Sequence, residues 1–307
     1  MALEGLHHVT AITADAQRNV DFYAGTLGLR LVKKTVNFDA PDVYHLYFGD
    51  ESGTPGSILT FFEFPGARPG RAGAGMVHRV LWRVGAPETL DFWERRLDGA
   101  ARTPDGTLRF ADPEGLEHEL VVASGPDRPL VAHAPDVPAA HALQGFHGVR
   151  AYAADPARSA PLLERLGFAR TGAGAAWELA GDERRALLAY DAPPPEPGIQ
   201  SAGSVHHVAW SAADDGELEL VSAAARGAGA RPTPIIDRRY FHSVYFREPS
   251  GVLFELATRD IGFDLDEPRE RLGEALMLPP QYEDRRAELE RSLTPLTNPR
   301  TRAAATP

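Results

Sequence analysis

The chain opens with Gly5-Leu6-His7-His8-Val9-Thr10, and nearly the same pattern returns much later as Ser204-Val205-His206-His207-Val208-Ala209. Each stretch sets a pair of histidines in a short run of apolar and β-branched residues, which is the composition of a β-strand. A pattern that recurs far along the same chain indicates repeated structural units. The residues that follow each stretch repeat as well.

The first repeat combines one strand, one helix and three further strands. A β-like run is followed by a segment with helical spacing, which Asp15 can cap and Gly28 can end. Residues typical of turns then separate three β-like runs. This predicts the order β-α-β-β-β, with strands at 5–12, 29–37, 43–48 and 57–64 and a helix at 15–27.

The same order returns three times, and each helix ends in a turn that contains glycine, the residue best suited to the left-handed end of a helix. The second copy has strands at 76–84, 106–111 and 116–123 and a helix at 87–97. The third has strands at 145–153, 168–171, 176–179 and 186–190 and a helix at 156–166. The fourth has strands at 204–211, 240–247 and 252–258 and a helix at 215–226.

A single βαβββ unit leaves one sheet face uncovered and needs a partner to bury it. The sequence therefore predicts an α+β fold in which four βαβββ modules pair into two open, mixed-sheet barrels. The predicted division is an N-terminal domain at 1–128, a linker at 129–143, a C-terminal domain at 144–260 and a tail at 261–307. The tail has helical character at 281–293 and an irregular end at 298–307.

The composition limits the classes of function. The 307 residues carry a net charge of −11, which argues against a nucleic-acid surface and gives no reason to expect membrane binding. No cysteine is present, so any metal must be held by histidine, carboxylate or backbone oxygen. The first residues lack the pattern of a secretory signal, and no apolar run could span a bilayer, so we expect a cytoplasmic protein.

The two histidine pairs and Glu255 are the candidate metal ligands. Neighbouring residues of a strand point to opposite faces, so we expect one histidine of each pair to face a pocket. Glu255 lies between Phe254 and Leu256 in an apolar run, where a buried carboxylate needs a partner. One histidine alone is usually a surface or core residue. Two matched pairs and a carboxylate instead indicate the two-histidine, one-carboxylate site of non-haem Fe(II) oxygenases.

Other residues compete with these ligands or could support them. His147 opens the third copy and is an alternative to His8. His78 with Glu119 could form a second site, but the favoured interpretation is a remnant of the repeat or a surface feature. Four further histidines, His45, His133, His141 and His242, are not assigned to a metal. Tyr245 lies one strand before Glu255 and could donate a hydrogen bond to a bound oxygen species. Arg238 and Arg239 precede that strand and could orient an anionic or phenolic ligand.

At these residues the sequence resembles a known family. The βαβββ repeat with its His, His and Glu is similar to the vicinal oxygen chelate superfamily, which includes glyoxalase I, fosfomycin-resistance proteins and type I extradiol dioxygenases. The resemblance is stronger to the hydroquinone-type ring-cleaving dioxygenases within it. The stretches that carry it are 6–10, 44–56, 145–147, 239–245 and 262–263 with the acidic tail that follows.

The resemblance implies a role for particular residues. His8 matches a metal ligand from the first module, and His207 and Glu255 match two from the fourth, so the first and fourth modules would form the metal barrel. In the arrangement of catechol extradiol enzymes, His147 would take the place of His8. The positions that match supporting or substrate-contacting residues are His7, Thr10, His206, Arg238 and Tyr245.

The expected activity is insertion of O2 into an aromatic diol, with a hydroquinone as the favoured substrate, in the breakdown of aromatic compounds. Fe(II) is the expected metal and Mn(II) suits the same ligands. The expected partners are the small aromatic diol and O2, and proteins of this architecture often self-associate.

A metal isomerase or thiol transferase of the glyoxalase class is the alternative. That class recruits a second glutamate, for which Glu63 is the sole candidate in the first module. The third class of function is a non-catalytic protein that binds a small molecule in the same pocket.

Overall fold

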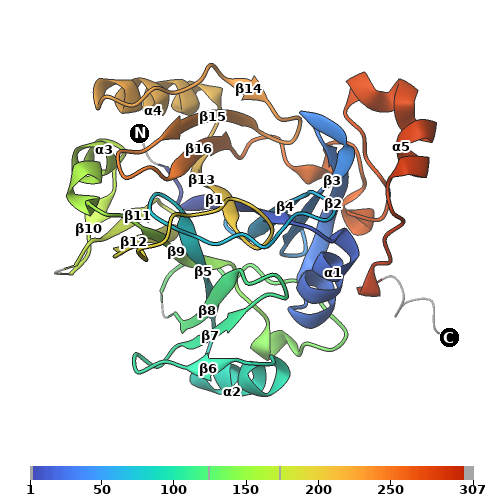
Figure 1. Ribbon diagram of the computed structural model, residues 1–307, viewed down its shortest axis with the longest axis horizontal. Helices are drawn as coiled ribbons and strands as arrows, with labels where there is room; N and C mark the ends of the chain where they lie inside the picture. Colours follow the sequence, from blue (N-terminus) through green and yellow to red (C-terminus); the bar gives the residue numbers. More distant parts are fainter. Residues whose placement is uncertain (1–2, 124, 173, 301–307) are drawn as a thin grey trace.

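The computed structural model describes residues 3–123, 125–172 and 174–300, so the predicted irregular end lies outside the described residues from 301 onward. Its core is a pair of eight-stranded mixed sheets, with the helices at the periphery (Figure 1). Each of the four modules supplies four strands, which confirms the predicted α+β fold of βαβββ units.

The first sheet joins the first module to the fourth. Its strand order is β14-β15-β16-β13-β1-β4-β3-β2, and β1 pairs antiparallel with β13 at its centre. Its strands are β1 (Leu6–Thr13), β2 (Arg30–Asn37), β3 (Ala40–Gly49), β4 (Ile58–Glu63), β13 (Val205–Ala212), β14 (Ile236–Asp237), β15 (His242–Arg247) and β16 (Leu253–Thr258).

The second sheet joins the second module to the third. Its order is β10-β11-β12-β9-β5-β8-β7-β6, with β5 antiparallel to β9 at the centre. Its strands are β5 (Val77–Val84), β6 (Ala101–Arg102), β7 (Leu108–Ala111), β8 (Glu117–Val122), β9 (Phe146–Tyr152), β10 (Ala169–Arg170), β11 (Ala176–Ala180) and β12 (Arg185–Asp191).

The pairing of modules cuts across the predicted division of the chain. Strands from 1–128 lie in both sheets, and so do strands from 144–260. Neither range forms a sheet of its own, because β1 pairs with β13 and β5 pairs with β9. The boundary at 129–143 separates pairs of modules in the sequence, whereas each sheet draws on both sides of it.

Helices begin where the repeat predicts, but several are shorter or irregular. The Asp15 carboxylate accepts a hydrogen bond from the backbone N–H of Arg18 at 3.0 Å and caps the first helix. The predicted continuous helix at 15–27 is instead α1 (Ala16–Val20) followed by a π-helical segment, Asp21–Thr26. The others are α2 (Pro87–Arg96), α3 (Ala160–Arg165), α4 (Asp215–Gly227) and α5 (Arg286–Ser292). No described helix is both long and apolar enough to cross a bilayer.

The tail packs across the first module and fixes one edge of it. Lys33 on β2 is fully buried, and its ammonium lies 2.8 Å from both Asp266 and Glu267. The Tyr282 hydroxyl donates a hydrogen bond to the carbonyl of Phe38 at 2.8 Å. A buried lysine needs such partners, since an uncompensated buried charge is strongly unfavourable. The tail therefore holds the turn between β2 and β3 in place.

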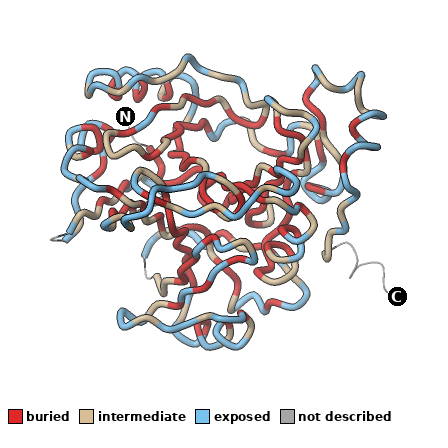
Figure 2. The backbone as a smooth tube through the Cα atoms, in the orientation of Figure 1, coloured by how far each residue is buried: buried red, intermediate tan, exposed pale blue. Residues whose placement is uncertain are grey.

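Buried residues are concentrated along the central strands of both sheets, and exposed residues lie mainly in the helices and turns (Figure 2). One buried polar cluster links the modules. The indole N–H of Trp82 donates to His118 Nδ1 at 3.1 Å, so a neutral His118 carries its hydrogen on Nε2. That nitrogen lies 2.9 Å from the Tyr23 hydroxyl, which donates to Asp112 at 2.9 Å. Tyr23 belongs to the first module and the other residues to the second.

Acid is expected to destabilise the fold through His118. Burial lowers the pKa of His118 to about 3, whereas the same group in the unfolded chain titrates near 6.5. The unfolded state therefore binds more protons between these values, and the free energy of unfolding falls as pH drops below 6.5, by up to about 1.4 kcal/mol per pH unit. Urea unfolding followed by circular dichroism at pH 7 and pH 5 measures this loss. The His118→Gln variant should lose less stability over that interval than the wild type does; an equal loss would contradict the assignment.

Candidate metal centre

Three adjacent strands of the first sheet bring His8, His207 and Glu255 together. His8 on β1 and Glu255 on β16 both align with Ala209, which lies on the strand between them. Residues in register on paired strands share a face, and His207 lies two residues before Ala209 on that same face. The three side chains therefore converge on the concave side of the sheet.

Two β-bulges change the directions in which the paired histidine side chains point. The pairing of β1 with β13 shifts register between Leu6 and His8, and again between Thr10 and Ala11. His7 is the extra residue at the first shift and His206 at the second, where His207 pairs with Thr10. The prediction that neighbouring histidines point to opposite faces is wrong here, because a bulge lets both rings of a pair meet. The Nδ1 atoms lie 2.9 Å apart in the first pair and 2.8 Å apart in the second.

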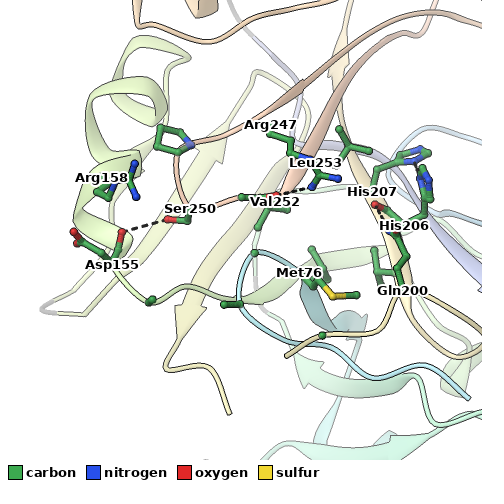
Figure 3. A pocket seen from close by; sticks show the side chains of 18 residues that line it. Met76, Asp155, Arg158, Gln200, His206, His207, Arg247, Ser250, Val252 and Leu253 are labelled. Carbon is green, nitrogen blue, oxygen red and sulfur yellow. Dashed lines mark hydrogen bonds between the residues drawn. The ribbon is translucent and has the colours of Figure 1, made fainter. Parts of the chain in front are cut away.

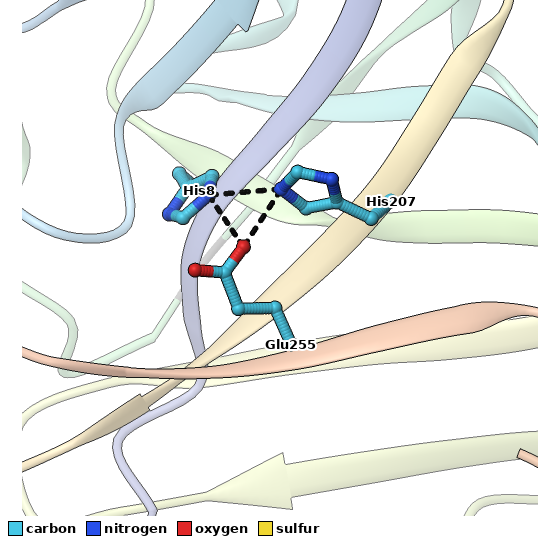
Figure 4. A group of neighbouring side chains, drawn as sticks. All are labelled: His8, His207 and Glu255. Atoms are coloured by element: carbon cyan, nitrogen blue, oxygen red, sulfur yellow. Dashed lines mark hydrogen bonds and ion pairs between the residues drawn. The ribbon is translucent and has the colours of Figure 1, made fainter. Parts of the chain in front are cut away.

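The candidate ligand atoms are close together (Figure 4). The Nε2 atoms of His8 and His207 are 3.3 Å apart, and they lie 3.1 Å and 2.7 Å from Glu255 Oε2. All three residues are buried, and Glu255 is fully inaccessible. Among the described residues, this is the one group of three such side chains whose ligand atoms could hold a metal ion.

The chemistry of these atoms fits a divalent cation. Glu255 Oε2 lies near both imidazoles, yet it accepts no well-aligned hydrogen bond from a described residue. Its other oxygen, Oε1, accepts hydrogen bonds from the hydroxyls of Ser243 and Tyr245. A buried carboxylate oxygen without an aligned donor is costly, and a metal ion bound by Oε2 and two imidazole nitrogens would remove that cost.

The hydrogen bonds of His7 set the tautomer of His8. The backbone carbonyl of Thr258 can only accept, so His7 donates to it from Nε2, over 3.0 Å. The Nδ1 atom of a neutral His7 is then an acceptor, and His8 donates to it from its own Nδ1. This leaves the Nε2 lone pair of His8 free to bind a metal, as an outer partner does at many metal sites.

Burial and the neighbouring groups both shift the pKa values of this cluster. Burial lowers the pKa of His207, and burial together with His8 lowers the pKa of His7 to about 3. Burial alone would raise the pKa of Glu255, but the neighbouring His8 and His207 hold that pKa well below its ordinary value. Neutral imidazoles beside an ionised carboxylate are the forms that bind a metal.

A cavity of about 380 Å³ opens directly onto the three residues. Six aromatic side chains line it: Phe38, Tyr47, Phe62, Phe64, Phe241 and Tyr245. A mostly apolar cavity with a few polar groups at one wall suits a small aromatic ligand. Thr10, His206 and Arg238 also line this cavity, so the structure brings them to the site, while His7 lies behind His8 and contacts it.

Tyr245 and Arg238 form a polar wall beside Glu255. The Tyr245 hydroxyl donates to Glu255 Oε1 at 3.0 Å, and Arg238 Nε donates to the Tyr245 oxygen at 3.3 Å. Burial and the charge of Glu255 raise the pKa of Tyr245, so its hydroxyl stays protonated. Arg239 points elsewhere: its φ of 67° places it in the left-handed region, and it pairs with Asp266 at 2.7 Å.

The competing sequence candidates lie in the other sheet or serve other roles. When the strand registers of the two sheets are aligned, three residues of the second sheet occupy the positions of the candidate ligands. Gly148 corresponds to His8, Arg79 to His207 and Glu119 to Glu255. Arg79 lies 3.2 Å from Glu119, so a guanidinium provides the positive charge there. A side chain at Gly148 would meet the carbonyl of Leu187 at 2.2 Å. Among the described residues, His147 belongs to no group of three side chains whose ligand atoms could hold a metal ion.

The first module has no carboxylate at the position that matches Glu255. The pairing of β1 with β4 in the first module matches the pairing of β13 with β16 in the fourth. Thr60, which pairs with Thr10, therefore stands at the position of Glu255, which pairs with Ala209. Glu63 instead accepts a hydrogen bond from the backbone N–H of Ala16 at 3.0 Å. The second glutamate that a glyoxalase-type site would need is therefore not supplied by Glu63.

A second cavity, of about 440 Å³, reaches the same histidines from another direction. It shares His206, His207 and Leu253 with the aromatic cavity. Figure 3 shows His206 and His207 at one end, with Arg158 at the other. Its lining is more polar, and it contains no member of the aromatic set above.

Sequence comparison places this fold and its buried His-His-Glu cluster in a family. The model of the Glyoxalase/Bleomycin resistance protein/Dioxygenase superfamily matches residues 5–120 and 75–256. The chain belongs to this superfamily. Glyoxalase I from Zea mays shares the fold, with a TM-score of 0.61 at 15% identity over 83% of this chain and 94% of that chain (an E144Q mutant structure).

Within the superfamily, the chain groups with ring-cleaving dioxygenases, which confirms the predicted branch. It is 41% identical over 305 residues to a Bacillus subtilis relative named "putative ring-cleaving dioxygenase MhqO", covering 95% of this chain and 96% of the relative. It is 33% identical over 322 residues to the chlorohydroquinone/hydroquinone 1,2-dioxygenase of Sphingobium indicum, covering 95% and 96%. A crystal structure of a B. subtilis "putative dioxygenase" has a TM-score of 0.90 at 40% identity, covering 97% and 98%.

Proposed function

We propose that this protein is an Fe(II)-dependent dioxygenase that opens the ring of a hydroquinone and incorporates O2 into the product. The observation that supports the proposal is the convergence of His8, His207 and Glu255 on one wall of an aromatic-lined cavity. Two imidazoles and one carboxylate are the donor set of non-haem Fe(II) oxygenases, and they leave positions open for substrate and O2. Mn(II) suits the same donors.

In this proposal the metal supplies the redox chemistry and favours the ionised form of a bound phenol. The chain's own residues bind and orient the ring. Phe62 and Phe241 offer aromatic faces in the cavity, and Arg238 brings a positive charge to the same space. Arg238 is held there by Asp39 at 3.3 Å and by the Tyr245 oxygen. A guanidinium so placed favours a phenolic oxygen that carries negative charge.

Two further groups are positioned to assist the reaction. Tyr245 stays protonated, and because the Ser243 hydroxyl also donates to Glu255 Oε1, the Tyr245 hydrogen can turn from that oxygen to a ligand in the cavity. His206 contacts the ring of His207 and lines the cavity, which makes it the candidate for carrying the proton that a phenol releases. His7 would act indirectly, by keeping the His8 ring in its metal-binding tautomer.

Two observations favour this reaction over the alternatives. A glyoxalase-type isomerase would need a second carboxylate at the metal. Here Thr60 stands at the matching position, and Glu63 accepts a hydrogen bond from the backbone N–H of Ala16. A catechol enzyme that uses His147 would need its ligands in the second sheet, where Arg79 already pairs with Glu119. The name of the S. indicum relative, which specifies hydroquinones, supports the choice of a para-diol.

Oxygen uptake tests the proposal directly. Protein loaded with Fe(II) under anaerobic conditions is expected to consume O2 when hydroquinone is added, and to lose this activity when a chelator removes the metal. Catechol should support little or no uptake. O2 uptake with catechol but not with hydroquinone would show that the substrate is an ortho-diol instead of the proposed para-diol. Conversion of a glutathione hemithioacetal without any O2 uptake would overturn the dioxygenase in favour of the isomerase.

A further inference from the structure

A chain of four hydrogen-bonding side chains runs along the aromatic cavity and ends at Thr10, two residues after His8 on β1. Tyr47 lies 2.9 Å from His45 Nδ1, and His45 Nε2 lies 2.8 Å from Thr60 Oγ1. Thr60 in turn donates to Thr10 Oγ1 at 3.1 Å. Three of these residues, Tyr47, His45 and Thr10, line the cavity. Neither His45, Tyr47 nor Thr60 has a role in the metal cluster or in the Tyr245 wall.

Sheet register explains why these residues meet. Thr10 on β1 pairs with Thr60 on β4, and Thr60 pairs with Tyr47 on β3. His45 lies two residues before Tyr47, on the same face of β3. The four side chains therefore stand on the concave face that also carries His8. Their order across the sheet is the order of the hydrogen bonds.

The direction of the hydrogen bonds is fixed along the chain. Because Thr60 gives its only hydroxyl hydrogen to Thr10, its oxygen must accept from His45, so His45 carries its hydrogen on Nε2. His45 Nδ1 then accepts from the Tyr47 hydroxyl. Thr10 Oγ1 is an acceptor toward Thr60, and its own hydrogen is left to point at a partner in the cavity. It makes no other side-chain hydrogen bond with the described residues.

The surroundings hold His45 in this orientation. Its ring lies 4.1 Å from the Tyr47 ring and 4.4 Å from the Phe62 ring, centroid to centroid. Only 9% of His45 is exposed. Both ring nitrogens have partners, so a rotation of the ring would break two hydrogen bonds in a buried place. Burial also lowers the pKa of His45 well below its ordinary value, which keeps one nitrogen free to accept.

We propose that His45 is a positioning residue that acts through Thr60 to hold the Thr10 hydroxyl as a hydrogen-bond donor to the phenolic oxygen of the bound ring. This rests on the proposed function to the extent that the ligand is a phenol. Thr10 contacts the ligand, whereas Tyr47, His45 and Thr60 fix the direction of its hydroxyl. A donor that is already oriented loses less freedom when the ligand binds, which strengthens binding.

A double-mutant cycle on Thr10 and Thr60 tests the inference. The readout is the affinity of Fe(II)-loaded, anaerobic protein for 4-chlorophenol, a monophenol, measured by calorimetry. Thr60→Val removes the hydroxyl with little change in shape and should weaken binding about tenfold, close to the effect of Thr10→Val. The double variant should be no weaker than Thr10→Val alone, because both changes remove the same hydrogen bond to the ligand. Thr60→Ser should restore wild-type affinity.

The matched control is Thr35→Val. Thr35 is fully buried in the same sheet, and its hydroxyl has no hydrogen-bond partner among the described residues. This variant should bind the phenol as the wild type does. His45→Leu should behave as Thr60→Val does, while His45→Gln, whose amide can still donate to Thr60, should retain most of the affinity. The metal content should be unchanged in all of these variants.

Several results would overturn the inference. These are full affinity in Thr60→Val, additive losses in the double variant, or an equal loss in Thr35→Val. The proposed function is tested separately by O2 uptake. If the wild type binds the phenol with the expected cycle but consumes no O2 with hydroquinone, the dioxygenase proposal fails and the positioning role of His45 stands.

Discussion

Replacing His207 with alanine is expected to abolish both tight metal binding and O2 uptake with hydroquinone. His207 Nε2 lies 2.7 Å from Glu255 Oε2 and 3.3 Å from His8 Nε2, so its loss removes one of three donors from a buried site. Removal of an outer partner of a metal ligand already lowers metal affinity or activity by roughly 10–100-fold. Loss of the ligand itself should exceed that range. Metal content after dialysis, measured by atomic absorption, checks the result, and His8→Ala should behave in the same way.

The matched control is His147→Ala. His147 is largely buried, and burial lowers its pKa to about 4, as expected for a neutral interior histidine. It lies on β9 in the second sheet, so its removal should leave the metal content and O2 uptake of the protein intact. Circular dichroism confirms that both variants are folded. Iron retained by folded His8→Ala and lost from His147→Ala would move the metal site to the third module. Iron retained by folded His207→Ala would contradict the assignment of His207 as a ligand.

The second large effect is expected from Tyr245→Phe. This change removes the hydroxyl that donates to Glu255 Oε1 at 3.0 Å and accepts from Arg238 at 3.3 Å. Groups that donate protons or hydrogen bonds in a reaction typically contribute about 10²–10⁴-fold to its rate, so kcat should fall by about 10²-fold or more. The protein should still bind metal, because the Ser243 hydroxyl continues to donate to Glu255 Oε1.

Steady-state kinetics and metal analysis on the same preparation separate the possible roles of Tyr245. A fall in kcat at full metal content assigns the hydroxyl to the reaction. A parallel loss of metal and activity would instead assign it to support of Glu255 and would contradict the catalytic role. Tyr152→Phe provides the control, since Tyr152 is on β9 and stacks on His78 in the other sheet, 3.9 Å between ring centroids. That variant should keep the wild-type kcat.

Much of the fold could be predicted because its signals are local. Strand and helix periodicity, with glycine at the helix ends, was enough to predict four βαβββ modules and the fold class. The two-residue strands β6 and β14 were missed, since two residues cannot show an alternation. The first helix was predicted as regular, but it changes to a π-helical segment at Asp21. Nothing in its spacing signals that change.

The site residues depended on more than local pattern. The residues by themselves favoured one histidine from each pair, and the resemblance to a family selected His8 and His207. The structure places these two with Glu255, and it also places Ser243, His45 and Thr60 around them, which sequence reasoning had left without a role. Ser243 and Thr60 lie in alternating strands, so a register between strands would have been needed to find them.

By itself, the sequence determined the modules, the absence of thiolate ligands and the presence of imidazoles and a carboxylate in apolar strands, because composition and spacing are properties of neighbouring residues. The residue pattern left open which modules share a sheet; the family resemblance implied that the first joins the fourth, and the tertiary structure confirms this pairing. It pairs β1 with β13 rather than with a strand of the second module, and it inserts the bulges at His7 and His206 that turn both rings of each pair to one another. Strand pairing and register are contacts between residues far apart in the chain, so packing of the whole sheet selects them.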